Sequence, residues 1–168
     1  MRTIDTLLDE LRQAAHTGDL GAVADVVRSA VRQVPVVPQV GASQLLRTEP
    51  GLTVLHTVVK PGFASPPHDH RTWAVIGVYS GQEDNTFFRR IEDRRGIEQI
   101  GRCTLKQSQV LILGSDAIHQ IATPLATKLI ALHVYGKNIF QIERSAWDPA
   151  TGKERPFKLA LDSRGMVR

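Results

Sequence analysis

Between about residue 50 and residue 143 the sequence is a succession of short segments rich in β-branched and apolar residues and separated by turn signals. Such segments are typical of β-strands, and pairs such as Ser80-Gly81 and Gly114-Ser115 are typical of the turns between them. Many short strands at this spacing favour a β-sandwich or a β-barrel. The predicted strands cover residues 52–59, 73–79, 86–91, 97–105, 109–113, 118–122, 128–135 and 139–143.

The first part of the chain has a different pattern. Apolar residues recur at helical spacing over residues 4–15 and again over residues 20–31. Asp19 is well placed to cap the second of these helices. Pro35 then ends the helical structure, because proline lacks a backbone N–H donor. The sequence therefore predicts a helical hairpin over residues 3–33.

The length of 168 residues suits a single domain that encloses one core. We expect a mainly β protein in which residues 1–39 form the helical hairpin, packed on the barrel. Residues 40–168 are expected to form the barrel itself. The polar C-terminal segment, residues 150–168, is expected to wrap the outside of that barrel.

Composition excludes several classes of protein. No run of about eighteen apolar residues is present, so we expect no membrane span, and the first residues do not resemble a signal peptide. Cys103 is the only cysteine, so an internal disulfide is excluded and the cytoplasm is the expected compartment. The net charge is +4, but the basic residues are scattered and we expect no binding to nucleic acid. The sequence leaves the oligomeric state open.

Three histidines form the sharpest local signal. His68 and His70 follow a rigid Pro-Gly and Pro-Pro stretch, and residues i and i+2 of a strand point to the same face. His119 begins another predicted strand after the turn at Gly114. Three neutral imidazoles on one face suit Fe(II), Zn(II) or Cu(II) better than Mg(II) or Ca(II), which prefer oxygen ligands.

A second pair of polar residues, His133 and Tyr135, shares one face of another predicted strand. A buried tyrosine hydroxyl needs a hydrogen-bond partner, which the neighbouring imidazole supplies. We expect His133 to orient Tyr135, whose hydroxyl would donate to a bound oxygen species or to the substrate. The alternative is a structural polar pair in the barrel wall.

The segment from Gly62 to Gly81, which contains His68-Asp69-His70, resembles the first cupin motif, and Gly114 to His119 resembles a loose form of the second. Together with Leu132-His133-Val134-Tyr135, the pattern is similar to the cysteine dioxygenase family, which includes bacterial mercaptopropionate dioxygenases. The resemblance spans roughly residues 50–148.

This resemblance implies a cupin double-stranded β-helix, with Fe(II) held by His68, His70 and His119. It implies that a small thiol and O₂ are the substrates and that the product is a sulfinic acid. By the same resemblance, His133 and Tyr135 would be the outer pair near the oxygen site.

The chain departs from the family pattern at several positions. Ala74 and Val75 stand where ordinary cupins have a glutamate ligand, which fits the thiol dioxygenases. No cysteine lies near Val75 to cross-link to the tyrosine. Ala131 replaces the serine that precedes the His-x-Tyr pair, so we expect a shortened outer network.

A small thiol acid needs a cation for its carboxylate, ideally a forked guanidinium. Arg47 and Arg144 are the candidate anchors, and we expect Trp73 to pack near the metal. Two other functions stay open: a cupin that binds metal and ligand without turnover, and a cupin enzyme that uses another metal such as zinc or manganese.

Overall fold

The computed structural model describes residues 3–33, 41–91 and 96–167. The chain begins with two helices, α1 (Ile4–His16) and α2 (Leu20–Val31), which pack against each other. The Asp19 side chain accepts a hydrogen bond from the Gly21 N–H (2.8 Å) and so caps α2. The predicted helical hairpin is confirmed.

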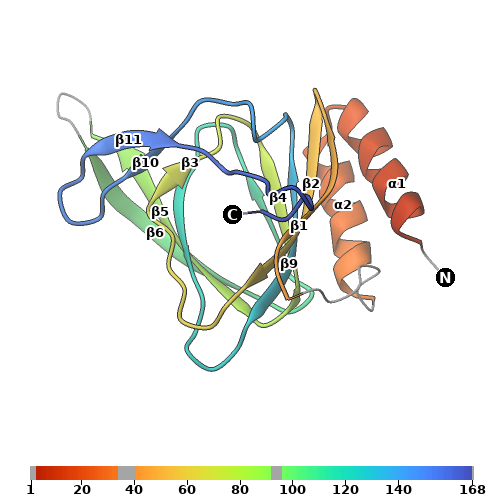
Figure 1. The fold of residues 1–168 in the computed structure, drawn as a ribbon, viewed down its shortest axis with the longest axis horizontal. Helices are drawn as coiled ribbons and strands as arrows, with labels where there is room; N and C mark the ends of the chain where they lie inside the picture. Colours follow the sequence, from red (N-terminus) through yellow and green to blue (C-terminus); the bar gives the residue numbers. More distant parts are fainter. Residues whose placement is uncertain (1–2, 34–40, 92–95, 168) are drawn as a thin grey trace.

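The rest of the described chain forms two antiparallel sheets that face each other (Figure 1). The five-stranded sheet has, in spatial order, β1 (Gln44–Glu49), β2 (Leu52–Val59), β9 (Leu129–Tyr135), β4 (Ala74–Ser80) and β7 (Val110–Leu113). The six-stranded sheet has, in spatial order, β11 (Glu154–Phe157), β10 (Arg144–Trp147), β3 (His68–Asp69), β8 (Ile118–Ala122), β5 (Gln82–Arg90) and β6 (Ile97–Lys106).

The chain passes repeatedly from one sheet to the other as it runs from β2 to β10. This winding of antiparallel strands through two facing sheets is a double-stranded β-helix. The predicted fold class, a mainly β barrel of the cupin type with an N-terminal helical hairpin, is therefore confirmed.

Two apolar cores share the five-stranded sheet. Its outer face packs against the helices, with Val54 and Leu132 in contact with the helical residues. Its inner face packs in the barrel, where Leu55 and Ala131 belong to the second core. Because side chains alternate between faces, β9 is buried along its whole length. This burial on both faces makes the sheet a rigid wall for the barrel interior.

The structure corrects two sequence-based expectations about the C-terminal part. Residues 139–143 form turns rather than a strand, with the Asn138 side chain accepting a hydrogen bond from the Phe140 N–H, and the strand begins at Arg144. The C-terminal segment does not simply wrap the outside, because Leu159 and Val167 line a cavity of the barrel. The expected boundary between the helical hairpin and the barrel, at residues 39 and 40, lies outside the described residues. In the described chain, neither helix has the length and apolar character needed to cross a membrane.

Gly77 lets α2 lie directly on β4, and we predict that Gly77→Ala destabilises the fold. A Cβ at this position would lie 2.5 Å from Val27 Cγ1 and 2.8 Å from Val31 Cγ1. Overpacking of this kind typically lowers the free energy of unfolding by about 1–3 kcal/mol. Urea unfolding measures the change. Gly101→Ala is the matched control, because a Cβ there meets nothing within 4 Å; equal effects of the two substitutions would contradict the prediction.

Candidate metal centre

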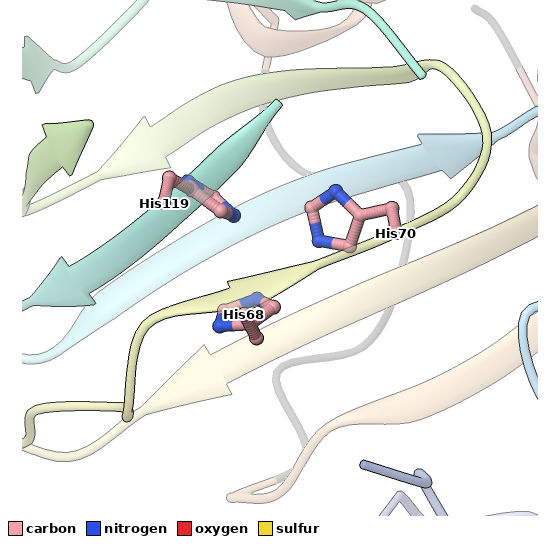
Figure 2. A group of neighbouring side chains, drawn as sticks. All are labelled: His68, His70 and His119. Carbon is pink, nitrogen blue, oxygen red and sulfur yellow. The ribbon is translucent and has the colours of Figure 1, made fainter. Parts of the chain in front are cut away.

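Strand pairing brings the three histidines together. His68 on β3 is the direct register partner of His119 on β8, and His70 follows immediately after β3. All three side chains are buried, and one ligand nitrogen from each lies within 4.8 Å of the others. Figure 2 shows the three rings gathered around a common space. The structure thus brings together the three residues that the sequence predicts as metal ligands.

Hydrogen bonds behind the rings leave nitrogens free to bind an ion. His68 Nδ1 lies 2.9 Å from the Pro66 carbonyl oxygen, and His119 Nδ1 lies 2.7 Å from Asn85 Oδ1. Because these oxygens only accept, both Nδ1 atoms must carry the proton, and both Nε2 atoms keep a lone pair. His119 Nε2 and His70 Nδ1 are buried and have no hydrogen-bond partner in the described part of the chain. These orphaned nitrogens fit a metal ion.

The electrostatic setting keeps the three rings neutral. Burial lowers the pKa of His68 to about 4, with a smaller lowering from the charge of Arg144. Burial, followed by the neighbouring imidazoles, lowers the pKa of His70 and His119 well below the usual value. Neutral imidazole is the form that ligates a metal ion. The site is therefore ready to bind without first losing protons at neutral pH.

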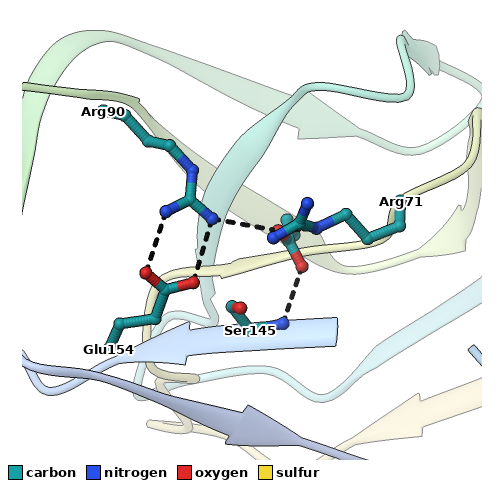
Figure 3. Close-up of polar contacts among 5 residues, drawn as sticks. Arg71, Arg90, Ser145 and Glu154 are labelled. Carbon is teal, nitrogen blue, oxygen red and sulfur yellow. Dashed lines mark hydrogen bonds and ion pairs between the residues drawn. The ribbon is translucent and has the colours of Figure 1, made fainter. Parts of the chain in front are cut away.

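Asp69, between His68 and His70, anchors this segment through contacts on the outer face of the sheet. Asp69 is buried, and its Oδ1 accepts a hydrogen bond from the Ser145 N–H of β10 (2.8 Å). Its Oδ2 accepts one from Arg71 Nε (2.6 Å) and lies 3.8 Å from Arg90 Nη2. Arg90 in turn forms a bidentate pair with Glu154 on β11 (Figure 3). Because Asp69 is tied outward, its two histidine neighbours are held inward.

The histidines form part of the wall of a cavity of about 570 Å³ inside the barrel. Apolar residues from β2, β8 and the C-terminal segment supply much of the remaining wall. Among the described residues of this wall none is acidic, whereas Lys60, Lys128 and Arg144 are basic. A cavity with this lining favours an anionic ligand.

Arg144 is the basic residue set deepest in this wall. It is 4 % exposed, and its guanidinium stacks over the Phe157 ring at 4.9 Å. Phe157 also contacts His68, with ring centroids 5.1 Å apart. Arg144 Nε and Nη2 are buried without a hydrogen-bond partner among the described residues. The Phe157 ring thus lies between the candidate anchor, Arg144, and His68 of the histidine cluster. The Nε and Nη2 donors of Arg144 are available to a ligand.

The structure places Arg47 and Trp73 elsewhere. Arg47 on β1 pairs with Asp9 of α1 (2.9 Å) and is absent from the cavity wall. Trp73 packs with the core between the helices and the five-stranded sheet, and its ring faces Gly136. Neither residue is brought to the histidine cluster, because Arg47 on β1 and Trp73, just before β4, lie on the helical side of the sheet. Phe157, which does contact the cluster, lies in the segment expected outside the barrel.

His133 and Tyr135 on β9 form the expected pair. His133 Nδ1 lies 3.1 Å from the Tyr135 hydroxyl oxygen, and the Tyr135 ring contacts His70 with centroids 5.2 Å apart. Burial raises the pKa of Tyr135, so the phenol keeps its proton at neutral pH. The pair therefore lies beside the candidate metal ligands.

Two residues of β5 extend the contacts of the His133 and Tyr135 pair. Glu83 is fully buried, and its Oε2 lies 3.5 Å from His133 Nε2. Asn85 donates to Glu83 Oε1 (2.9 Å) and also binds His119. Sequence reasoning missed both residues because it began this strand at residue 86. Their i, i+2 spacing, directly after the Ser80-Gly81 turn, was the available signal.

Comparisons with known proteins give only distant structural likenesses. No model of a known protein family matches the sequence. The chain is similar to an RmlC-like cupin family protein with a double-stranded β-helix fold from Methanocaldococcus jannaschii, with a TM-score of 0.48 and 13 % identity over 64 % of this chain and 89 % of that one. A Cupin 2 conserved barrel domain protein from Salinispora arenicola gives a TM-score of 0.44 and 19 % identity over 64 % and 76 %. A DMSP lyase from Ruegeria pomeroyi gives a TM-score of 0.47 and 15 % identity, over 61 % of this chain and 49 % of that one.

The low pKa of the histidines predicts that the metal-free protein loses stability in mild acid. The unfolded chain takes up protons near pH 6.5, whereas folded His68 does so only near pH 4. Stability is therefore fully present above pH 6.5 and falls as the pH drops toward 4. His68 accounts for a loss on the order of 3 kcal/mol. Urea unfolding across this range measures it. A His68→Gln variant should show a shallower decline, and an identical decline would contradict this assignment.

Proposed function

We propose that the protein is a non-haem Fe(II) thiol dioxygenase, which oxidises a small thiol of the cysteine or 3-mercaptopropionate type to a sulfinic acid with O₂. One observation carries the proposal: three neutral imidazoles converge, with no carboxylate among them, beside a buried guanidinium that has unsatisfied donors. The proposal also draws on the resemblance of the His-x-His, His119 and His-x-Tyr patterns to the cysteine dioxygenase family. It requires one metal, one thiol and one O₂.

The iron would be held by His68, His70 and His119. Three protein ligands leave coordination positions open for small molecules, as in other catalytic metal sites. Bound there, iron supplies the redox chemistry through which both oxygen atoms are added to the thiol sulfur. The protein's own contribution is to hold the three rings neutral and correctly turned, through the Pro66 carbonyl and Asn85.

The substrate's carboxylate would bind to Arg144. A guanidinium presents parallel N–H donors that match a carboxylate, and this one is held in place by stacking on Phe157. Because no described residue of the cavity wall is acidic, a substrate ammonium would find no charged partner. We therefore propose a thiol that carries a carboxylate, and we expect cysteamine to be a poor substrate.

The apolar wall would limit the access of water to the reacting sulfur. Leu55 and Val59 from β2 face Ile121 from β8, and Leu159 and Val167 come from the C-terminal segment. Interactions between charges are stronger where water is excluded, so the attraction between Arg144 and a carboxylate gains from this enclosure. The substrate would then be held with its thiol turned toward the histidines.

Oxygen uptake tests the proposal directly. We expect Fe(II)-loaded protein to consume one O₂ for each thiol converted to sulfinic acid, with 3-mercaptopropionate and cysteine active. His119→Ala should lower the rate by more than about 100-fold, since a ligand matters more than the residues behind it. His16→Ala, which alters an exposed histidine at the end of α1, is the control and should leave the rate unchanged. No thiol-dependent uptake, or one equivalent of zinc in protein purified without added metal, would contradict the proposal.

Substitution of Arg144 tests the carboxylate anchor. We expect Arg144→Gln to raise the KM for 3-mercaptopropionate about 30-fold, which corresponds to about 2 kcal/mol for a buried charge pair. The KM for cysteamine should change little, because that thiol has no carboxylate. Arg155→Gln alters an exposed arginine on β11 and serves as the matched control. A similar loss for both thiols would show that Arg144 supports the site structurally and does not bind the carboxylate.

A further inference from the structure

A chain of polar contacts crosses the barrel from one sheet to the other. It begins at His119 on β8, passes through Asn85 and Glu83 on β5, and ends at His133 and Tyr135 on β9. Asn85 and Glu83 belong to the six-stranded sheet, whereas the last two residues belong to the five-stranded sheet. All five residues are buried. Buried polar groups are usually hydrogen-bonded, so the protons along these contacts are expected to be ordered.

The direction of the first two bonds follows from the residue types. Asn85 Nδ2 donates to Glu83 Oε1 (2.9 Å), which fixes the orientation of the amide. Asn85 Oδ1 therefore faces His119 Nδ1 at 2.7 Å, and because an amide oxygen only accepts, His119 must donate. Hydrogen bonds thus run from His119 through Asn85 to Glu83. Glu83 Oε2 is left to meet His133.

The contact between Glu83 and His133 then decides which nitrogen of His133 carries the proton. Glu83 Oε2 and His133 Nε2 are 3.5 Å apart, which is longer than an ordinary hydrogen bond. Both atoms are nevertheless buried and have no other partner among the described residues. An N–H facing a carboxylate oxygen is attractive, whereas a ring lone pair facing it would be repulsive. The proton is thus favoured on Nε2.

The other ring nitrogen of His133, Nδ1, faces Tyr135. With a single proton on Nε2, Nδ1 is an acceptor, and its partner at 3.1 Å is the Tyr135 hydroxyl. The Tyr135 proton is then directed at His133. Its oxygen lone pairs are left for the cavity.

We propose that Glu83 is a positioning residue that sets this polarity through His133, so that Tyr135 presents a hydrogen-bond acceptor to the cavity. This reverses the expectation from sequence that Tyr135 donates to a bound group. The substrate group that lies against Tyr135 must then itself be a donor, such as a thiol S–H or an N–H. The inference depends on the proposed function only in taking this cavity as the substrate site.

Histidine tautomers can be read by two-bond ¹⁵N–¹H correlation NMR on the full-length chain, labelled at histidine and without added metal. We expect His133 to be the Nε2–H tautomer, whereas His68 and His119 should be Nδ1–H tautomers. The three histidines therefore serve as internal references for one another, and single substitution of each assigns the signals. A wild-type His133 that carries its proton on Nδ1, or on both nitrogens, would overturn the proposal.

Glu83→Gln provides the sharper test. The Asn85 NH₂ group should continue to donate to the side-chain oxygen at position 83. The NH₂ group of the new amide would then face His133 Nε2 and move the His133 proton to Nδ1. Glu98→Gln makes the same change at an exposed glutamate paired with Arg89 and should leave the tautomer unaltered. An unaltered tautomer in Glu83→Gln would contradict the positioning role. The wild-type spectrum decides by itself if that variant does not fold, and because it needs neither metal nor thiol, its result is separate from that of oxygen uptake.

Discussion

The pairing of β3 with β8 is the contact on which the candidate site depends. It sets His68 directly opposite His119, and a slip of one residue would turn His68 to the outer face of the sheet. Because β3 has two residues, its own ladder is too short to hold this register. Bonds on either side hold it: the Trp147 N–H donates to the Pro67 carbonyl (2.9 Å), and the Ser145 N–H donates to Asp69. Asp69, whose carboxylate points away from the cavity, thus helps to hold His68 and His70 in position at the candidate site.

The distribution of charge across the six-stranded sheet follows from this arrangement. On its outer face, Arg71 and Arg90 are matched by Asp69 and Glu154. On its inner face, Glu83 is kept behind the cavity wall, where it contacts His133 and Asn85 and leaves the wall without an acidic group. The inner face therefore retains unsatisfied imidazole nitrogens and an unsatisfied guanidinium. Such a surface is complementary to a cation and an anion bound together.

Sequence reasoning succeeded where a single local pattern determined the result. The bounds of β2 and β8 were predicted correctly because Pro-Gly and Gly-Ser turns delimit them, and the i, i+2 rule placed His68 and His70 on one face. It failed where long-range pairing decides. Nothing local to Arg144 indicates that its strand begins there, that β11 pairs beside it, or that Phe157 folds back over the cavity. The role of Glu83 depends in the same way on a contact between two sheets.

Arg144 and Arg90 differ in both burial and pairing. Both arginines stack on an aromatic ring, Phe157 and Trp147 respectively. Arg90 is half exposed and has a bidentate carboxylate partner, although exposed ion pairs add little stability. Arg144 is buried, where an unpaired charge lowers stability substantially, yet its Nε and Nη2 have no partner in the described chain. A buried arginine with a purely structural role would be expected to have a carboxylate partner. The carboxylate of the proposed substrate would complete the free donors of Arg144.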